Sequence, residues 1–167
     1  MVKGALRSGQ SVSDIMPNLN YLDMSIGQMS GSLGEVAAIA LLLGGVYMLV
    51  RKTITWHIPV AVLGSMALMT GVMYVANPQA YMDPVFHLLS GGAILGAVYM
   101  ATAYVTSPMT TRGKIVFGVG VGVITVVIRV WGAYPEGMSF AILLMNACVP
   151  LIDKGFRPRR FGKKNSK

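Results

Sequence analysis

Polar and ionisable side chains within otherwise apolar stretches are the residues of this sequence that could do chemistry. The stretch RVWGAYPEGMSFAILLMNACVPLID, residues 129–153, carries Arg129, Glu136, Asn146 and Asp153, each roughly two to three helical turns from the next. Glu35 occupies a similar position in SGSLGEVAA. Because an ionised group is costly to place away from water, each of these residues requires a structural or a functional reason.

Glu35 has two interpretations. Its carboxylate can stabilise the start of a helix through the macrodipole, with Ser30 or Ser32 as the capping residue. Alternatively, Gly31 and Gly34 let the backbone approach a ligand closely, which would make this segment a binding loop. The residues alone leave both interpretations open.

The charged groups near the C-terminus also have structural explanations. Arg129 can extend to the membrane surface, pair with Glu136 or another acid, or act directly on an ion or cofactor. Glu136 precedes an apolar run, where a carboxylate favours a helix start. Asp153 ends that run beside Lys154, and a local ion pair with Lys154 or Arg157 would explain it.

Histidine and cysteine do not indicate a metal centre. His57 and His87 are far apart in the sequence, and Cys148 is the single cysteine. This spacing matches no zinc or haem motif, so we assign no metal ligand and no catalytic residue. The run FGVGVGV, with Gly118, Gly120 and Gly122, is not a dinucleotide fingerprint, and it indicates close helix packing through small residues.

The composition is that of a membrane protein. Of 167 residues, 54% are hydrophobic and 12% are charged, whereas a soluble domain carries about 25% charged residues. The net charge of +8 does not indicate nucleic-acid binding, because seven of the fourteen basic residues lie in the tail 154–167. Such a tail after an apolar segment is typical of a topology signal beside anionic lipid.

The hydropathy pattern predicts an all-α, polytopic membrane bundle of about five transmembrane helices. An extracytoplasmic leader, residues 1–33, precedes the membrane domain, residues 34–153. The five expected spans are residues 34–50, 56–76, 84–105, 114–132 and 137–153.

The charges of the connections predict the orientation of these spans. Arg51 and Lys52, then Arg112 and Lys114, and finally the basic tail alternate with connections that carry an acid and no base. By the positive-inside rule the basic segments are cytoplasmic, so the N-terminus lies outside the cell membrane. An external start suggests that a membrane half precedes this chain; a small protein that inserts N-terminus outward is the alternative.

The third expected span contains Ser90, Gly91 and Gly92. Apolar segments interrupted by glycine or proline indicate a binding site near the membrane midplane in transporter-like folds. Chemistry alone therefore predicts a helical protein that conducts or binds something polar.

Four blocks of sequence resemble a known family in the same order. They are GSLGEVAAIALLLGGVYMLVRKTITWHIPV, PVFHLLSGGAILGAVYMATAYVTSP, TRGKIVFG and RVWGAYPEGMSFAILLMNACVPLIDKGFRPRRFG. Together they resemble the C-terminal half of the D subunit of Rnf-type ion-translocating oxidoreductase complexes, which is homologous to the B subunit of sodium-translocating NADH:quinone reductases. The resemblance covers about residues 20–162.

The resemblance implies a flavin-containing, redox-driven ion pump in the inner membrane. It implies electron transfer between ferredoxin and NAD coupled to sodium or proton movement, and partnership with the other subunits of the complex. It also implies one half of a two-fold repeated fold similar to urea and ammonium transporters. Enzymatic activity would belong to the complex, and the chain alone carries no assigned activity.

Two departures from the family pattern limit what the resemblance implies, the first for the flavin and the second for an acid on the inner membrane side that would carry an ion or hold a partner. Family members attach FMN to a threonine in a motif like S-x-A-T-P-L, which is absent here; Met100-Ala101-Thr102 is the nearest similar string. Ala103 stands where the family typically has an acid. FMN is therefore expected from the family without a covalent site in this chain, and riboflavin is a second expected flavin.

The resemblance also ranks the acids. Glu35, Asp153 and Glu136, in that order, match family acids and are expected in the ion path, because a carboxylate can replace hydration water around a cation. The cofactor-binding candidates are Ser90, Gly91, Gly92, Gly31 and Gly34.

Three functions remain open at this point. The first is a subunit of the electron-transfer pump. The second is a stand-alone transporter or channel-like module without redox chemistry. The third is an inactive truncated fragment, which the absent flavin motif favours.

Overall fold

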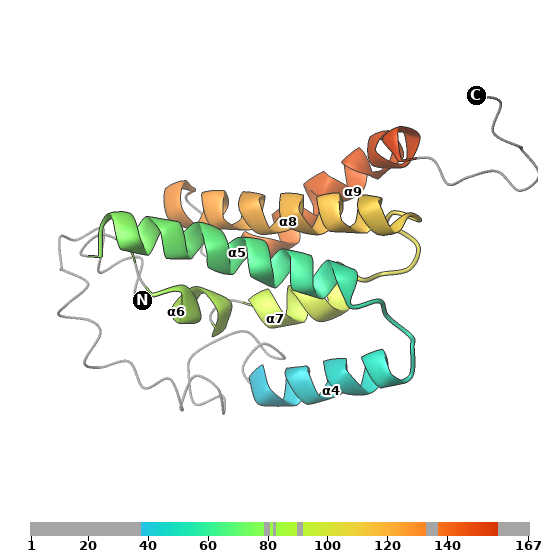
Figure 1. The fold of residues 1–167 in the computed structure, drawn as a ribbon, viewed down its shortest axis with the longest axis horizontal. Helices are drawn as coiled ribbons and strands as arrows, with labels where there is room; N and C mark the ends of the chain where they lie inside the picture. The colour runs from blue at the N-terminus through green and yellow to red at the C-terminus, as the bar shows by residue number, and fades with distance from the viewer. Residues whose placement is uncertain (1–37, 79–80, 82, 90–91, 133–136, 157–167) are drawn as a thin grey trace, which may run out of the picture.

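The computed structural model describes residues 38–78, 81, 83–89, 92–132 and 137–156. These residues form helices and contain no strand (Figure 1). The helices are α4 (Ala38–Val50), α5 (His57–Ala76), α6 (Pro84–Leu89), α7 (Ala93–Leu95), the π-helix η2 (Gly96–Met100), α8 (Thr111–Trp131) and α9 (Met138–Gly155).

The predicted fold class, an all-helical membrane bundle, is confirmed. Within the described residues, α5, α8 and α9 are long and apolar enough to cross a bilayer. Helix α4 is apolar but has 13 residues, which is about 20 Å of helix against a hydrocarbon core of about 30 Å. The chain is therefore an integral membrane protein.

The third expected span differs from the prediction of one helix over residues 84–105. Helix α6 ends at Leu89, α7 begins at Ala93, and η2 ends at Met100. Gly92 has φ 62° and ψ 16°, a left-handed conformation that cannot continue a right-handed helix. This segment is therefore two short helical pieces, α6 and α7 with η2, joined at a break. We call it the broken element, and Figure 1 shows it beneath α5.

Helices α5 and α8 pack closely through small residues, as the glycine run predicts. A Cβ added to Gly118 would lie 2.6 Å from Ala61 Cβ, and one added to Gly122 would lie 2.7 Å from the Val62 carbonyl oxygen and overlap the Ser65 hydroxyl. The spacing of four residues on both helices is the small-xxx-small pattern of membrane helix pairs.

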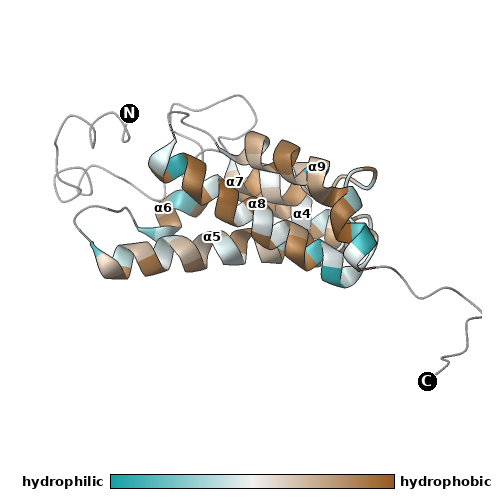
Figure 2. Cartoon of the chain, turned by 90° about the horizontal axis from the view of Figure 1, so that it is seen from above, coloured by the Kyte–Doolittle hydropathy of each residue, from teal (hydrophilic) through white to brown (hydrophobic). Residues whose placement is uncertain are grey.

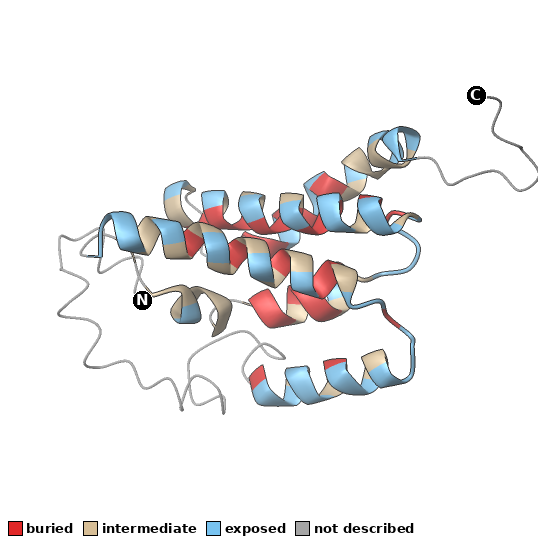
Figure 3. Ribbon diagram, in the orientation of Figure 1, coloured by how far each residue is buried: buried red, intermediate tan, exposed pale blue. Residues whose placement is uncertain are grey.

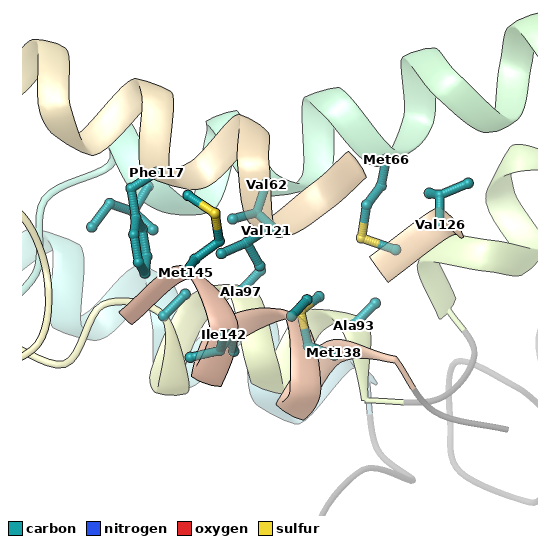
Figure 4. Packing of buried hydrophobic residues seen from close by; sticks show 13 residues of the cluster. Val62, Met66, Ala93, Ala97, Phe117, Val121, Val126, Met138, Ile142 and Met145 are labelled. Atoms are coloured by element: carbon teal, nitrogen blue, oxygen red, sulfur yellow. The ribbon is translucent and has the colours of Figure 1, made fainter. Parts of the chain in front are cut away.

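The larger of two apolar clusters joins α5, α8, α9 and the broken element (Figure 4). Its larger members are Ile58, Val62, Met66, Phe117, Val121, Val126, Met138, Ile142 and Met145, and Ala93, Ala97 and Ala101 contribute from the broken element. Figure 3 shows the buried residues on the facing sides of these helices, with exposed residues on the outer sides. The exposed outer faces are themselves rich in Leu, Val and Phe, as expected of surfaces that contact lipid.

Helix α4 lies apart from α5 and contacts the broken element (Figure 1). The Tyr99 hydroxyl donates a hydrogen bond to the Leu41 carbonyl oxygen at 2.9 Å, and Gly45 packs against Val98. After the end of α4 at Val50, Lys52 has φ 55°, and Lys52 N and Thr53 N donate hydrogen bonds to the Leu49 and Met48 carbonyl oxygens in a Schellman arrangement.

The basic residues gather at one end of the bundle. Lys114 Nζ donates to Thr55 Oγ1 at 3.4 Å, which places the start of α8 beside the start of α5. Arg112 and Lys154 belong to the same end, which is hydrophilic in Figure 2. Among the described basic residues, Arg129 is the exception and lies near the other end of α8.

Candidate functional site

The break between α6 and α7 is the first feature of the candidate site. Of the three residues predicted to interrupt this span, Gly92 caps α7, and its carbonyl oxygen accepts a hydrogen bond from Gly96 N at 2.7 Å. Ser90 and Gly91 lie outside the described residues. A broken helix leaves main-chain carbonyls without helical donors, and inside a membrane these carbonyls need other partners.

Arg129 provides one such partner. Its Nη1 donates a hydrogen bond to the main-chain carbonyl oxygen of His87, at 2.5 Å. His87 lies in the last turn of α6, and the Arg129 side chain is buried, with 8% of its surface exposed. A guanidinium at this position both satisfies a carbonyl and opposes the negative end of the helix dipole.

This contact explains why the membrane domain contains Arg129. The sequence suggested pairing with an acid or extension to the surface, whereas the described contact is with the backbone of the broken element. Glu136 lies outside the described residues, so its pairing with Arg129 stays a prediction.

The π-helix η2 follows the break directly. Ala101 N donates to Gly96 O at 2.7 Å across five residues, which widens this turn. Gly96 packs against Met138 at the start of α9, where a Cβ would overlap the Met138 side chain. Such π-turns are frequent at functional sites, and here one holds the broken element against α9.

Asp153 lies away from the break, at the basic end of the bundle. Its Oδ1 accepts a hydrogen bond from Met109 N at 3.2 Å, and the side chain is half-buried. The carboxylate thereby holds the segment before α8 against the end of α9. Its expected role in the ion path remains a prediction.

The other predicted site residues lie outside the described residues. These are Glu35 and Glu136 among the acids and Gly31 and Gly34 among the cofactor-binding candidates. The structure therefore places Gly92 at the break and Asp153 at the basic end of the bundle, and it tests none of the ion-path or cofactor-binding assignments.

The residues around Thr102 do not fit a covalently attached flavin. The Thr102 hydroxyl donates to the Val98 carbonyl oxygen at 2.5 Å, within its own helical turn. Ala103, where the family typically has an acid, is exposed in the turn after η2, and its carbonyl accepts from Ser107 N at 3.1 Å. Neither residue presents a free group to a flavin phosphate.

A shallow pocket of about 360 Å³ occurs at the basic end. It is lined by Thr110, Thr111, Arg112, Gly155 and Phe156. It lies beside Asp153 along the chain and is not part of the break.

Sequence reasoning missed the Arg129–His87 contact and the π-helix. A main-chain acceptor has no side-chain signature, and Gly96–Met100 is as apolar as the α-helical turns beside it. The spacing Gly92-x-x-x-Gly96 was the one available signal of an irregular turn.

Comparison with known proteins assigns the family. The profile of the NQR2, RnfD, RnfE family matches residues 2–162. The D subunit of the proton-translocating ferredoxin:NAD(+) oxidoreductase complex of Clostridium ljungdahlii is 46% identical over 142 residues, 85% of this chain and 43% of the relative. The D subunit of the ion-translocating oxidoreductase complex of Halorhodospira halophila is 42% identical over 95% of this chain and 45% of the relative.

A third relative carries a different ion in its name. The D subunit of the Na(+)-translocating ferredoxin:NAD(+) oxidoreductase complex of Acetobacterium woodii is 40% identical over 94% of this chain and 46% of the relative. The chain thus spans somewhat less than half the length of these relatives. The resemblance found in the sequence is confirmed, and the chain belongs to the NQR2/RnfD/RnfE family.

Proposed function

We propose that this chain forms a membrane-embedded part of the D subunit in an ion-translocating oxidoreductase complex. The complex would couple electron transfer between ferredoxin and NAD to the movement of sodium ions or protons. The observation that carries the proposal is 40–46% identity over 85–95% of the chain to proteins named as that subunit.

The geometry supports a role in translocation. The third apolar segment is broken at Gly92, and a buried arginine binds the end of its first piece. Discontinuous helices of this kind line ion and substrate sites in transporters, because their ends present polar backbone groups inside the membrane. We propose that the segment is part of one half of a two-fold repeated fold.

The comparisons favour this function over the two alternatives. The relatives are named as subunits of multi-subunit complexes, which a stand-alone channel would not require.

The proposed orientation follows from the charge distribution. The end that carries Arg112, Lys114 and Lys154 would face the cytoplasm and its anionic lipid, with the tail 154–167 on the same side. The leader 1–33 would then lie outside an inner, cytoplasmic membrane. The partners are the other subunits and lipid, without nucleic acid.

We further propose that a flavin, FMN or riboflavin, belongs to the assembled complex. Thr102 is engaged with its own helix, so covalent FMN would be attached elsewhere in the complex. When bound, the flavin supplies one- and two-electron redox chemistry. The described helices of this chain would form a surface against which the other subunits pack.

Affinity purification of the full chain tests this function. A C-terminal tag is added, membranes are solubilised in mild detergent, and intact masses and flavin absorption are measured on the co-purifying material. We expect the other subunits, bound flavin and ferredoxin-dependent NAD reduction, all absent from an untagged control. A lone, colourless chain would contradict the proposal.

A further inference from the structure

The basic end of the bundle carries more positive charge than its acids can balance. Asp153 is the single acid among the described residues of this end, and its carboxylate already accepts a hydrogen bond from Met109 N at 3.2 Å. The described cations of the same end are Arg51, Lys52, Arg112, Lys114 and Lys154. Arg112 is exposed and has no hydrogen-bond or ion-pair partner among the described residues. Its guanidinium is therefore available to an anion.

The shallow pocket of this end contains that guanidinium. The pocket, of about 360 Å³, lies between the start of α8 and the end of α9 and is lined by Thr110, Thr111, Arg112, Gly155 and Phe156. A Cβ built on Gly155 would meet nothing within 4 Å, so no side chain fills the pocket there. A guanidinium and two threonine hydroxyls are donors that suit the oxygens of a phosphate group.

The depth of the pocket in the membrane follows from the length of α8. This helix has 21 residues, about 32 Å, against a hydrocarbon core of about 30 Å, so its first turn lies at the membrane surface. In the connection that precedes it, Tyr104, Val105 and Met109 are almost fully exposed. Aromatic and apolar side chains beside cations are typical of the membrane interface. The pocket therefore lies at the level of the lipid headgroups.

Exposed apolar side chains continue from the pocket toward the membrane. Leu151 lies one turn before Gly155 on α9 and is exposed, and Ile115 and Val116 lie one turn after Arg112 on α8 and are also exposed. A free phosphate ion would leave this surface bare. A phospholipid would cover it with an acyl chain while its phosphate occupied the pocket, so the arrangement fits a lipid better than a soluble anion.

We propose that this pocket binds the phosphate group of an anionic phospholipid in the leaflet that the basic end faces. Arg112 and the hydroxyls of Thr110 and Thr111 donate to the phosphate oxygens, and an acyl chain lies against Leu151. Basic pockets between membrane helices are known to bind anionic headgroups. Because the pocket joins the start of α8 to the end of α9, the bound lipid stabilises this end of the bundle. The site is separate from the break and does not depend on the proposed electron transfer.

The test measures lipid binding to the tagged full chain, together with any subunits that co-purify, in mild detergent. Phosphatidylglycerol, phosphatidylcholine and inorganic phosphate are titrated separately, and the melting temperature is recorded at each concentration. Arg112→Gln removes the charge from the pocket, and Gly155→Leu fills the pocket while keeping every charge. Arg51→Gln is the matched control, since it removes an exposed cation of the same end that does not line the pocket.

We expect phosphatidylglycerol to raise the melting temperature of the parent, and phosphatidylcholine and inorganic phosphate to leave it unchanged. The half-saturating phosphatidylglycerol concentration should rise about ten-fold in Arg112→Gln and in Gly155→Leu, and at most about two-fold in Arg51→Gln. Arg112 and Gly155 are exposed, so without lipid both variants should melt as the parent does.

Three results would overturn the lipid site. Equal weakening by Arg112→Gln and Arg51→Gln would show a diffuse attraction of charges, and unchanged binding in both pocket variants would place the lipid elsewhere. Equal stabilisation by inorganic phosphate would show a site for a free anion. A lone, colourless chain that still binds phosphatidylglycerol through Arg112 would contradict the proposed function and leave the lipid site standing.

Discussion

The buried guanidinium of Arg129 on α8 donates a hydrogen bond to the main-chain carbonyl oxygen of His87 in the last turn of α6, at 2.5 Å. This contact joins a continuous membrane helix to the first piece of a broken one. It places a positive charge at the negative end of a helix whose last carbonyls have no helical donors. A residue of α8, outside the broken element, therefore stabilises the break.

Replacing Arg129 with Met should destabilise the protein by about 1.5–3 kcal/mol, the usual contribution of a hydrogen bond to a charged group. Arg129→Lys should recover part of the loss, because a lysine keeps the charge without the planar donor pair. Thermal unfolding in detergent, followed by fluorescence-detected gel filtration, measures the difference. Equal melting temperatures for Met, Lys and the parent would show that the contact is unimportant.

Gly122 tests the packing of α5 against α8. Gly122→Val should destabilise by about 1–3 kcal/mol or more, because a side chain there meets the Val62 carbonyl and Ser65. Gly64→Ala is the matched control, since a Cβ there meets nothing within 4 Å, and it should stabilise α5 by about 0.5–1 kcal/mol. The same thermal unfolding assay compares the two variants. An unchanged melting temperature for Gly122→Val would refute the close approach of α5 and α8.

Gly92→Ala tests the left-handed residue at the break. An alanine at φ 62° is strained by about 1–2 kcal/mol, and Gly92→Asn should be tolerated better because asparagine visits this region. We expect ferredoxin-driven ion uptake by the complex to fall more in Gly92→Ala than in Gly92→Asn. If alanine is as active as asparagine, the break does not depend on this conformation.

Tyr99→Phe tests the attachment of α4 to the broken element. Loss of the hydrogen bond to the Leu41 carbonyl should lower stability by about 0.5–1.5 kcal/mol. Tyr104 is 95% exposed, so Tyr104→Phe should leave the melting temperature unchanged. Identical effects of both substitutions would argue against the Tyr99 contact.

The fold class and the position of the break were predictable, because hydropathy, proline and glycine report them directly. The hydropathy pattern predicts one helix to residue 105, yet η2 ends at Met100, because turns within residues 101–107 carry no charge that would mark them as outside the apolar run. Likewise, nothing in the composition of Gly96–Met100 distinguishes a π-turn from an α-turn.

The candidate site was predictable only where side chains define it. Gly92 was identified because glycine is the residue for a left-handed turn, and Asp153 because an acid in an apolar run is conspicuous. The partner of Arg129 is a backbone carbonyl, which any residue would supply.

We propose that this chain is a working part of an ion-translocating oxidoreductase. The most direct test is to delete the gene and measure ferredoxin-dependent NAD reduction and the accompanying cation uptake in inverted membrane vesicles. We predict that both activities are lost together and that both return when the intact chain is supplied, but only weakly with Arg129→Met. Vesicles that retain both activities without the chain would contradict the account.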